Sequence, residues 1–156
     1  MKPVIYALLI PAFLSALPVI AAENPITEKN WRNHPAIVEV RGIFSEIETG
    51  VKKKAFSPSA VSEPAGTAFR DASGRIRKFV FEGGSEDSAY TASQYYDSAA
   101  TLRFIFVTAG AVNGAQAEYR VYFNAAGKKI WENRTLTTKQ GYTFPETWPD
   151  DAIARP

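Results

Sequence analysis

Side-chain oxygens recur at three similarly flanked positions of the 156-residue chain. Asp71, Asp97 and Asn124 each follow an aromatic segment and precede a short run of small residues. Three oxygens brought together could bind calcium, which prefers oxygen ligands. Asp and Asn also begin turns by accepting hydrogen bonds from nearby backbone N–H groups. Because no segment has the ligand density of a calcium-binding loop, we expect each residue to begin its own turn, and we predict no metal site.

A second polar group surrounds two other turns. Glu86, Asp87 and Ser88 follow a pair of glycines, and Asn113 precedes Gly114. Paired acids on a glycine-rich loop could carry out acid–base chemistry or bind a cation. Solvated acids on an exposed loop explain the same pattern. The acids that follow the glycines after Ser85 would repel phosphate, which disfavours a phosphate-binding loop. These four residues are candidate binding residues.

The composition gives little support to nucleophilic catalysis. The chain has one His and no Cys, which excludes disulfides, thiolate metal sites and Cys nucleophiles. His34 directly precedes Pro35 at the start of an expected helix, where a capping role is favoured over a place in a catalytic triad. We therefore expect no catalytic residues and no cofactor.

Aromatic residues, at 13% of the chain, are concentrated in its strand-like segments. A sheet covered by a single helix leaves its other face open, and aromatic side chains on that face would form a binding surface. The candidates for this surface are Tyr90, Tyr96, Tyr119 and Trp131. Core packing and cross-strand pairing are the alternative roles for the same rings.

The pattern of apolar residues predicts one helix followed by strands. Apolar residues recur at steps of three and four over 35–51, which places them on one helical face. Residues 57–66, with two prolines, are expected to be a connector. The expected strands are 65–70, 75–82, 88–96, 102–112, 115–123 and 128–137. The tail 141–156 is expected to be irregular, held in place by Tyr142, Phe144 and Trp148.

An internal repeat links these strands. Segment 69–74 returns as 95–100 and again as 122–127, with Ala100 standing where the outer copies have glycine. The units resemble the hairpin repeats of tyrosine–aspartate (YD) repeat proteins. The whole chain also resembles small exported bacterial proteins of unknown function that share a Gly-Gly-Ser-Glu-Asp-Ser loop and an Asn-Gly hairpin. The resemblance implies hairpins and turns and transfers no catalytic residue.

Strands joined by short turns must be antiparallel neighbours. We therefore predict an α+β fold in which one N-terminal amphipathic helix packs on a curved, antiparallel, six-stranded meander. A small closed β-barrel is the alternative, because a long meander tends to curl.

Residues 1–22 have the organisation of a secretory signal peptide. Lys2 precedes an apolar run over 4–20, and Ala21 and Ala22 follow it. Two prolines interrupt the run, which disfavours a membrane anchor, so we expect no stable membrane span after cleavage. The remaining chain is predicted to comprise an extended lead-in over 23–34, with Trp31 against the domain, and a single domain over 35–156. The predicted location is the periplasm or the exterior.

A formal net charge of +2 and the absence of a basic stripe argue against nucleic acid as a partner. The leading hypothesis is an exported, non-catalytic binding module for a protein or an envelope component, with an inhibitor of a secreted hydrolase as one form. A hydrolase that uses Glu86 and Asp87 is the first alternative. A carrier of a small apolar ligand is the second, if the sheet encloses a cavity.

Overall fold

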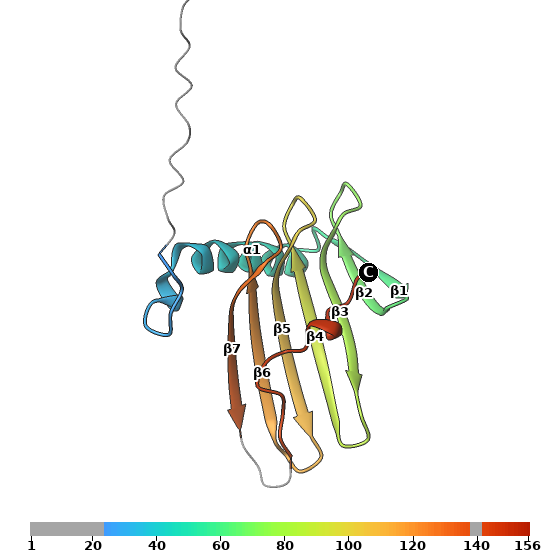
Figure 1. Cartoon of the computed structure of the whole chain (residues 1–156). Helices are drawn as coiled ribbons and strands as arrows, with labels where there is room; N and C mark the ends of the chain where they lie inside the picture. The colour runs from blue at the N-terminus through green and yellow to red at the C-terminus, as the bar shows by residue number, and fades with distance from the viewer. Residues whose placement is uncertain (1–23, 138–141) are drawn as a thin grey trace, which may run out of the picture.

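A computed structural model describes residues 24–137 and 142–156, so the predicted signal peptide at 1–22 lies outside the described residues. The 3-10 helix η1 (Trp31–Asn33) comes first, where the sequence predicts an extended segment. It is followed by helix α1 (Pro35–Lys52) and by seven strands, and a second 3-10 helix, η2 (Asp150–Ala152), lies near the C-terminus. The strands are β1 (Ser57–Ser62), β2 (Ala65–Arg70), β3 (Ile76–Gly84), β4 (Ser88–Tyr96), β5 (Leu102–Ala111), β6 (Gln116–Phe123) and β7 (Lys129–Thr137). Figure 1 shows α1 lying across one end of the sheet.

The strands form one sheet in chain order from β1 to β7, and every neighbouring pair is antiparallel. The predicted α+β meander is therefore confirmed. One detail of the prediction is wrong, and its alternative does not hold. The sheet has seven strands instead of six, and it is open, with β1 and β7 at its edges, so the barrel alternative does not hold.

The additional strand is β1, within the segment that the sequence predicts to be a connector. Its residues Ser57–Ser62 pair with Ala65–Arg70 along their whole length. Pro58 lacks an N–H donor, but an edge strand has a side without a neighbour, so proline is tolerated there. Pro64 lies in the short turn between the two strands. The prolines therefore mark an edge hairpin.

The start of α1 is held by His34. The His34 Nδ1 accepts a hydrogen bond from the Ala36 N–H at 3.3 Å, and Nε2 donates to the Asn24 carbonyl at 2.8 Å. Pro35 occupies the first turn, where its missing N–H costs nothing. The predicted capping role of this histidine is confirmed.

The three repeat units form the same turn. In each, the Oδ1 of Asp71, Asp97 or Asn124 accepts the backbone N–H groups two and four residues later, at 2.9–3.1 Å. The residue three positions on has a positive φ, namely Gly74 at 79°, Ala100 at 62° and Gly127 at 73°. The prediction that each polar residue begins its own turn is confirmed.

Ala100 is the strained member of this set, since a left-handed conformation costs a non-glycine residue about 1–2 kcal/mol. Glycine at position 100 would remove that strain while making the unfolded chain more flexible, which costs about 0.4–1 kcal/mol. We expect Ala100→Gly to raise the free energy of unfolding by about 0.5–1 kcal/mol, and Gly127→Ala to lower it by a similar amount. Urea denaturation measures both changes. Destabilisation by Ala100→Gly would contradict this account.

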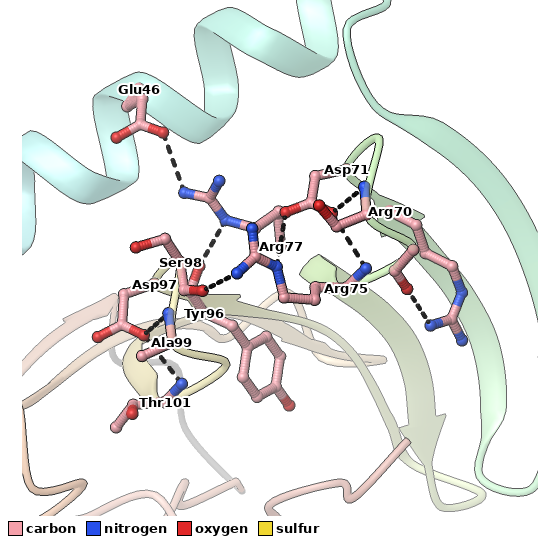
Figure 2. A network of polar contacts seen from close by, with 12 residues as sticks. Glu46, Arg70, Asp71, Arg75, Arg77, Tyr96, Asp97, Ser98, Ala99 and Thr101 are labelled. Carbon is pink, nitrogen blue, oxygen red and sulfur yellow. Dashed lines mark hydrogen bonds and ion pairs between the residues drawn. The ribbon is translucent and has the colours of Figure 1, made fainter.

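The repeat also places two arginines under α1. Bulges at the register shifts of β2–β3 and β4–β5 leave Arg77 and Arg103 as the extra residues. Each Nε donates to a carbonyl on the next hairpin, that of Tyr96 at 3.1 Å or Phe123 at 3.3 Å. The third copy has Ile130 at this position, packed in the apolar cluster beneath α1. Figure 2 shows the turn hydrogen bonds and the Arg77 contacts of the first repeat.

Both arginines form ion pairs with α1. Arg77 Nη2 lies 3.0 Å from Glu46 Oε1, and Arg103 Nη2 lies 2.7 Å from Glu39 Oε1. The two glutamates are seven residues apart, about 10.5 Å along a helix. The two arginines are two strands apart, about 9.6 Å across a sheet. The near match explains why a helix lying across the strands can use one kind of contact twice.

A third contact between α1 and the sheet is centred on Glu48. Its Oε1 accepts hydrogen bonds from Lys78 Nζ at 2.6 Å and from the Tyr95 hydroxyl at 2.8 Å. Burial alone would raise the pKa of Glu48, but the hydrogen bonds from Lys78 and Tyr95 and the nearby positive charges outweigh it and lower the pKa below 4.5. Burial and the neighbouring carboxylate raise the pKa of Tyr95, so its hydroxyl remains a donor.

A lowered pKa in the folded state makes the contribution of Glu48 dependent on pH. The carboxylate stabilises the fold above its unfolded-state pKa, and this stabilisation disappears as the pH falls through the folded-state pKa. We expect Glu48→Gln to cost about 1 kcal/mol near neutral pH, and the difference from the wild type to close as the pH falls below 4.5 and through the lowered pKa of Glu48 in the folded state. Denaturant unfolding of both proteins across this range measures the difference. A gap that is as large in acid as at neutral pH would contradict the assignment.

The C-terminal segment covers the face of the sheet opposite α1. Phe144 and Trp148 are buried against strand residues such as Phe81 and Val107, and Tyr142 packs beside them. The predicted role of these three aromatics in holding the tail is confirmed. Figure 1 shows the segment crossing the strands. We call this side the tail-side face and the other the helix-side face, and the expectation of an open face opposite the helix is wrong.

Candidate functional site

The uncovered part of the sheet lies on the helix-side face. On the helix-side face, residues that are paired directly between neighbouring strands form rows that run across the sheet. The row beneath α1 contains Tyr95, Phe104 and Tyr122, all at most 5% exposed. Beyond α1 the rows become polar and more exposed. We call this region the open half of the helix-side face.

Two rows make up most of the open half. The nearer row to α1 runs from β3 to β7 through Val80, Ser93, Phe106, Arg120 and Asn133. The next runs through Glu82, Thr91, Thr108, Glu118 and Thr135. The rows differ in chemistry, because the first offers a ring and a guanidinium whereas the second offers hydroxyls between two carboxylates.

A hollow of about 570 Å³ lies where the open half meets α1. We call it the helix-side hollow. Its aromatic walls are Trp31, Phe44, Phe104, Phe106 and Tyr122. Its polar lining is Arg32, Arg41, Arg120, Asn133 and Thr135, so its charged groups are all cationic.

Contacts with rings position the guanidinium groups of this hollow. The Arg41 Cζ lies 5.2 Å from the centre of the Trp31 ring, and the Arg120 Cζ lies 5.1 Å from that of Phe106. Trp31 in turn stacks on Trp131, with ring centres 6.0 Å apart. An Arg41 Nη1 donates to the Arg32 carbonyl at 2.8 Å. The cations are thus held in place on an aromatic surface.

A second hollow, of about 740 Å³, lies farther from α1, and we call it the far hollow. Its lining includes Thr91, Thr108 and the carboxylates of Glu82 and Glu118. The Arg120 guanidinium meets the Glu118 carboxylate at 2.7 Å, at the boundary between the two hollows. The open half is therefore cationic beside α1 and acidic at its far end.

The structure brings the loop candidates together at the far end of the sheet. The loop of Glu86 and Asp87 lies beside the turn of Asn113, because the Val112 N–H donates to the Asp87 carbonyl at 2.9 Å. The Ser88 hydroxyl accepts a hydrogen bond from the Tyr142 hydroxyl at 2.8 Å, which anchors the tail. Glu86 and Asp87 are exposed, and both lie outside the linings of the helix-side hollow and the far hollow.

The four aromatic candidates do not share an open surface. Tyr90, Tyr96 and Tyr119 belong to the tail-side cluster, whereas Trp131 lies on the helix-side face. Tyr119 is 1% exposed and its hydroxyl donates to the Pro145 carbonyl at 2.7 Å. Burial raises the pKa of Tyr96 to about 12. Tyr90 and Tyr119 therefore hold the tail, Tyr96 packs in the same cluster, and of the four candidates only Trp131 lies near the open half, where it stacks on Trp31.

The residues of the helix-side hollow were missed by the sequence analysis. Phe106 and Arg120 lie in the predicted strands 102–112 and 115–123, but neither is among the candidate residues. The alternation of Glu118, Arg120 and Tyr122 was the available signal, since it shows one face of β6 changing from charged to aromatic along its length.

Among the described residues, no group of three or more His, Cys, Asp or Glu side chains could hold a metal ion. Within those residues, no helix has the length and apolar character required to cross a membrane. The fold and the site thus define an open antiparallel meander with one covering helix and a hollowed, partly uncovered face. Comparison of the chain with protein-family models, curated proteins and solved structures finds no match in any of the three.

Proposed function

We propose that this protein is an exported, non-catalytic binding module that holds an envelope component on the open half of its helix-side face. The observation that carries the proposal is the unequal covering of the sheet. The tail buries aromatic residues on one face, whereas α1 leaves two adjoining hollows on the other. Concave surfaces with convergent polar groups on a rigid scaffold are typical of binding sites.

The arrangement of acids favours binding over hydrolysis. A general acid–base pair must share a site with its substrate. Glu86 and Asp87 lie on an exposed loop, and Glu118 is paired with Arg120. The open sheet likewise offers no enclosed barrel interior for a carrier. A binding surface does not require these carboxylates to act as a general acid or base.

Export rests on the charged start, apolar run and small-residue end of 1–22. Expression of the full chain in a bacterial host, followed by N-terminal sequencing of the exported protein, tests it. We expect a mature chain that begins at Ala22 or Glu23. A chain retained in the cytoplasm with its first 22 residues intact would contradict export.

Capture from a native envelope extract tests the binding site. The bait is the chain from Glu23, compared with Thr108→Arg in the far hollow and with Thr147→Arg in the tail. Both threonines are exposed, so the two variants add the same charge to different faces. We expect a component that the wild type and Thr147→Arg retain and that Thr108→Arg loses. Equal retention by all three would place binding elsewhere.

A further inference from the structure

We propose that the helix-side hollow recognises a small amphipathic anion, with an apolar or aromatic body and one carboxylate group. This inference rests on the proposed function and names the chemistry that the open half selects. It is argued from the lining of the hollow, the contacts of its guanidinium groups and the change of charge along the strands.

The walls of the hollow suit an apolar body. Phe44 from α1 meets Phe104 from β5 with ring centres 5.4 Å apart, and Trp31 meets Tyr122 at 6.4 Å. Phe106 is the partly exposed ring at the floor. A volume of about 570 Å³ is within the range of small-molecule sites. Trp31, Phe104 and Tyr122 are at most 8% exposed, so an apolar body would be buried chiefly against Phe44 and Phe106.

The charge of the lining requires an anion. Arg32, Arg41 and Arg120 line the hollow, and no Asp or Glu of residues 24–137 and 142–156 does so. Among the described residues, the carboxylate paired with them is that of Glu118, which lies in the far hollow. Stacking on Trp31 and Phe106 limits the freedom of Arg41 and Arg120, so less entropy is lost when they bind a ligand. A guanidinium has five N–H donors, which allows a bidentate contact with a carboxylate.

The far hollow sets the orientation of the ligand. Glu82 and Glu118 would repel a carboxylate placed there, whereas the guanidinium groups beside α1 would attract it. The anionic end is therefore expected beside α1, with the rest of the body directed along the strands over Phe106. A cationic or neutral amphipath would lack this preference.

Two matched pairs of probes test the inference by isothermal titration calorimetry. The pairs are 1-naphthoate with 1-naphthalenemethanol, and decanoate with decanol, so that each pair differs in the carboxylate. We expect each carboxylate to bind at least about tenfold more tightly than its alcohol. The double variant Arg41→Gln/Arg120→Gln should lose this preference and leave binding of the alcohols unchanged. Arg70→Gln, on β2, removes one positive charge outside the hollow, which matches the change in Arg120→Gln alone, and should keep the preference.

Circular dichroism and thermal unfolding show whether the double variant is folded. If it is not, Arg120→Gln alone should still reduce the preference for the carboxylate. Equal binding of acids and alcohols by the wild type, or binding of neither, would overturn the inference. Neither calorimetric result changes the comparison of Thr108→Arg with the wild type in the capture experiment. Failure of this inference is therefore distinguishable from failure of the proposed function.

Discussion

Trp148→Ala is expected to release the C-terminal segment from the sheet and to lower the free energy of unfolding by about 3–5 kcal/mol. Trp148 is 7% exposed, and its ring centre lies 5.0 Å from that of Tyr90 and 5.6 Å from that of Tyr119. Its indole N–H has no hydrogen-bond partner among the described residues, so the loss is one of packing. The backbone N–H that donates to Glu132 is retained in alanine.

Urea denaturation measures this loss, and hydrogen exchange shows whether the strands beneath the tail become exposed. Thr147→Ala is the matched control, because Thr147 is the exposed neighbour and should cost less than about 0.5 kcal/mol. A Trp148→Ala protein within about 1 kcal/mol of the wild type would show that the tail is not held by this ring.

Arg103→Met is expected to lower the free energy of unfolding by about 2–3 kcal/mol. The Arg103 side chain is 5% exposed and bridges Glu39, Asp97 and the Phe123 carbonyl, and these hydrogen bonds raise its pKa against the effect of burial. Methionine fills a similar volume but leaves the 16%-exposed Asp97 without this partner. Glu39 is 59% exposed, so water can replace its contact and it contributes little.

Arg75→Met provides the comparison for this prediction. The Arg75 side chain is 48% exposed and pairs with Asp71 within the first turn, so its loss should cost less than about 1 kcal/mol. The difference between the two arginines measures the buried contacts of Arg103 with Asp97 and the Phe123 carbonyl. Equal costs for the two substitutions, measured by urea denaturation, would contradict the view that the buried contacts of Arg103 stabilise the fold.

Local patterns predicted most of the strands and turns. The strand 88–96 is observed with these bounds, and the repeat of Asp71, Asp97 and Asn124 gave the three turns, because their hydrogen bonds lie within five residues. The edge strand β1 was missed because the prolines at 58 and 64 are typical of loops. Only its pairing with β2 makes Ser57–Ser62 a strand.

The candidate site was predictable only in part, because it depends on contacts between distant segments. The meeting of the Asp87 loop with the Asn113 turn followed from connectivity alone. The covering of the tail-side face could not be predicted in this way, since it depends on a hydrogen bond between Tyr119 and Pro145, which are 26 residues apart in the sequence. Because the tail covers the tail-side face, the open surface lies on the helix-side face, beside α1. There Phe106 on β5 is paired directly with Arg120 on β6.

Site-specific photo-crosslinking in intact cells tests the central claim most directly. A photoreactive phenylalanine analogue replaces Thr108 in the open half or, as the control, Thr147 on the tail, and intact mass shows any adduct. Binding on the helix-side face predicts an adduct from position 108 and none from position 147. An adduct from position 147 with none from position 108 would contradict the claim.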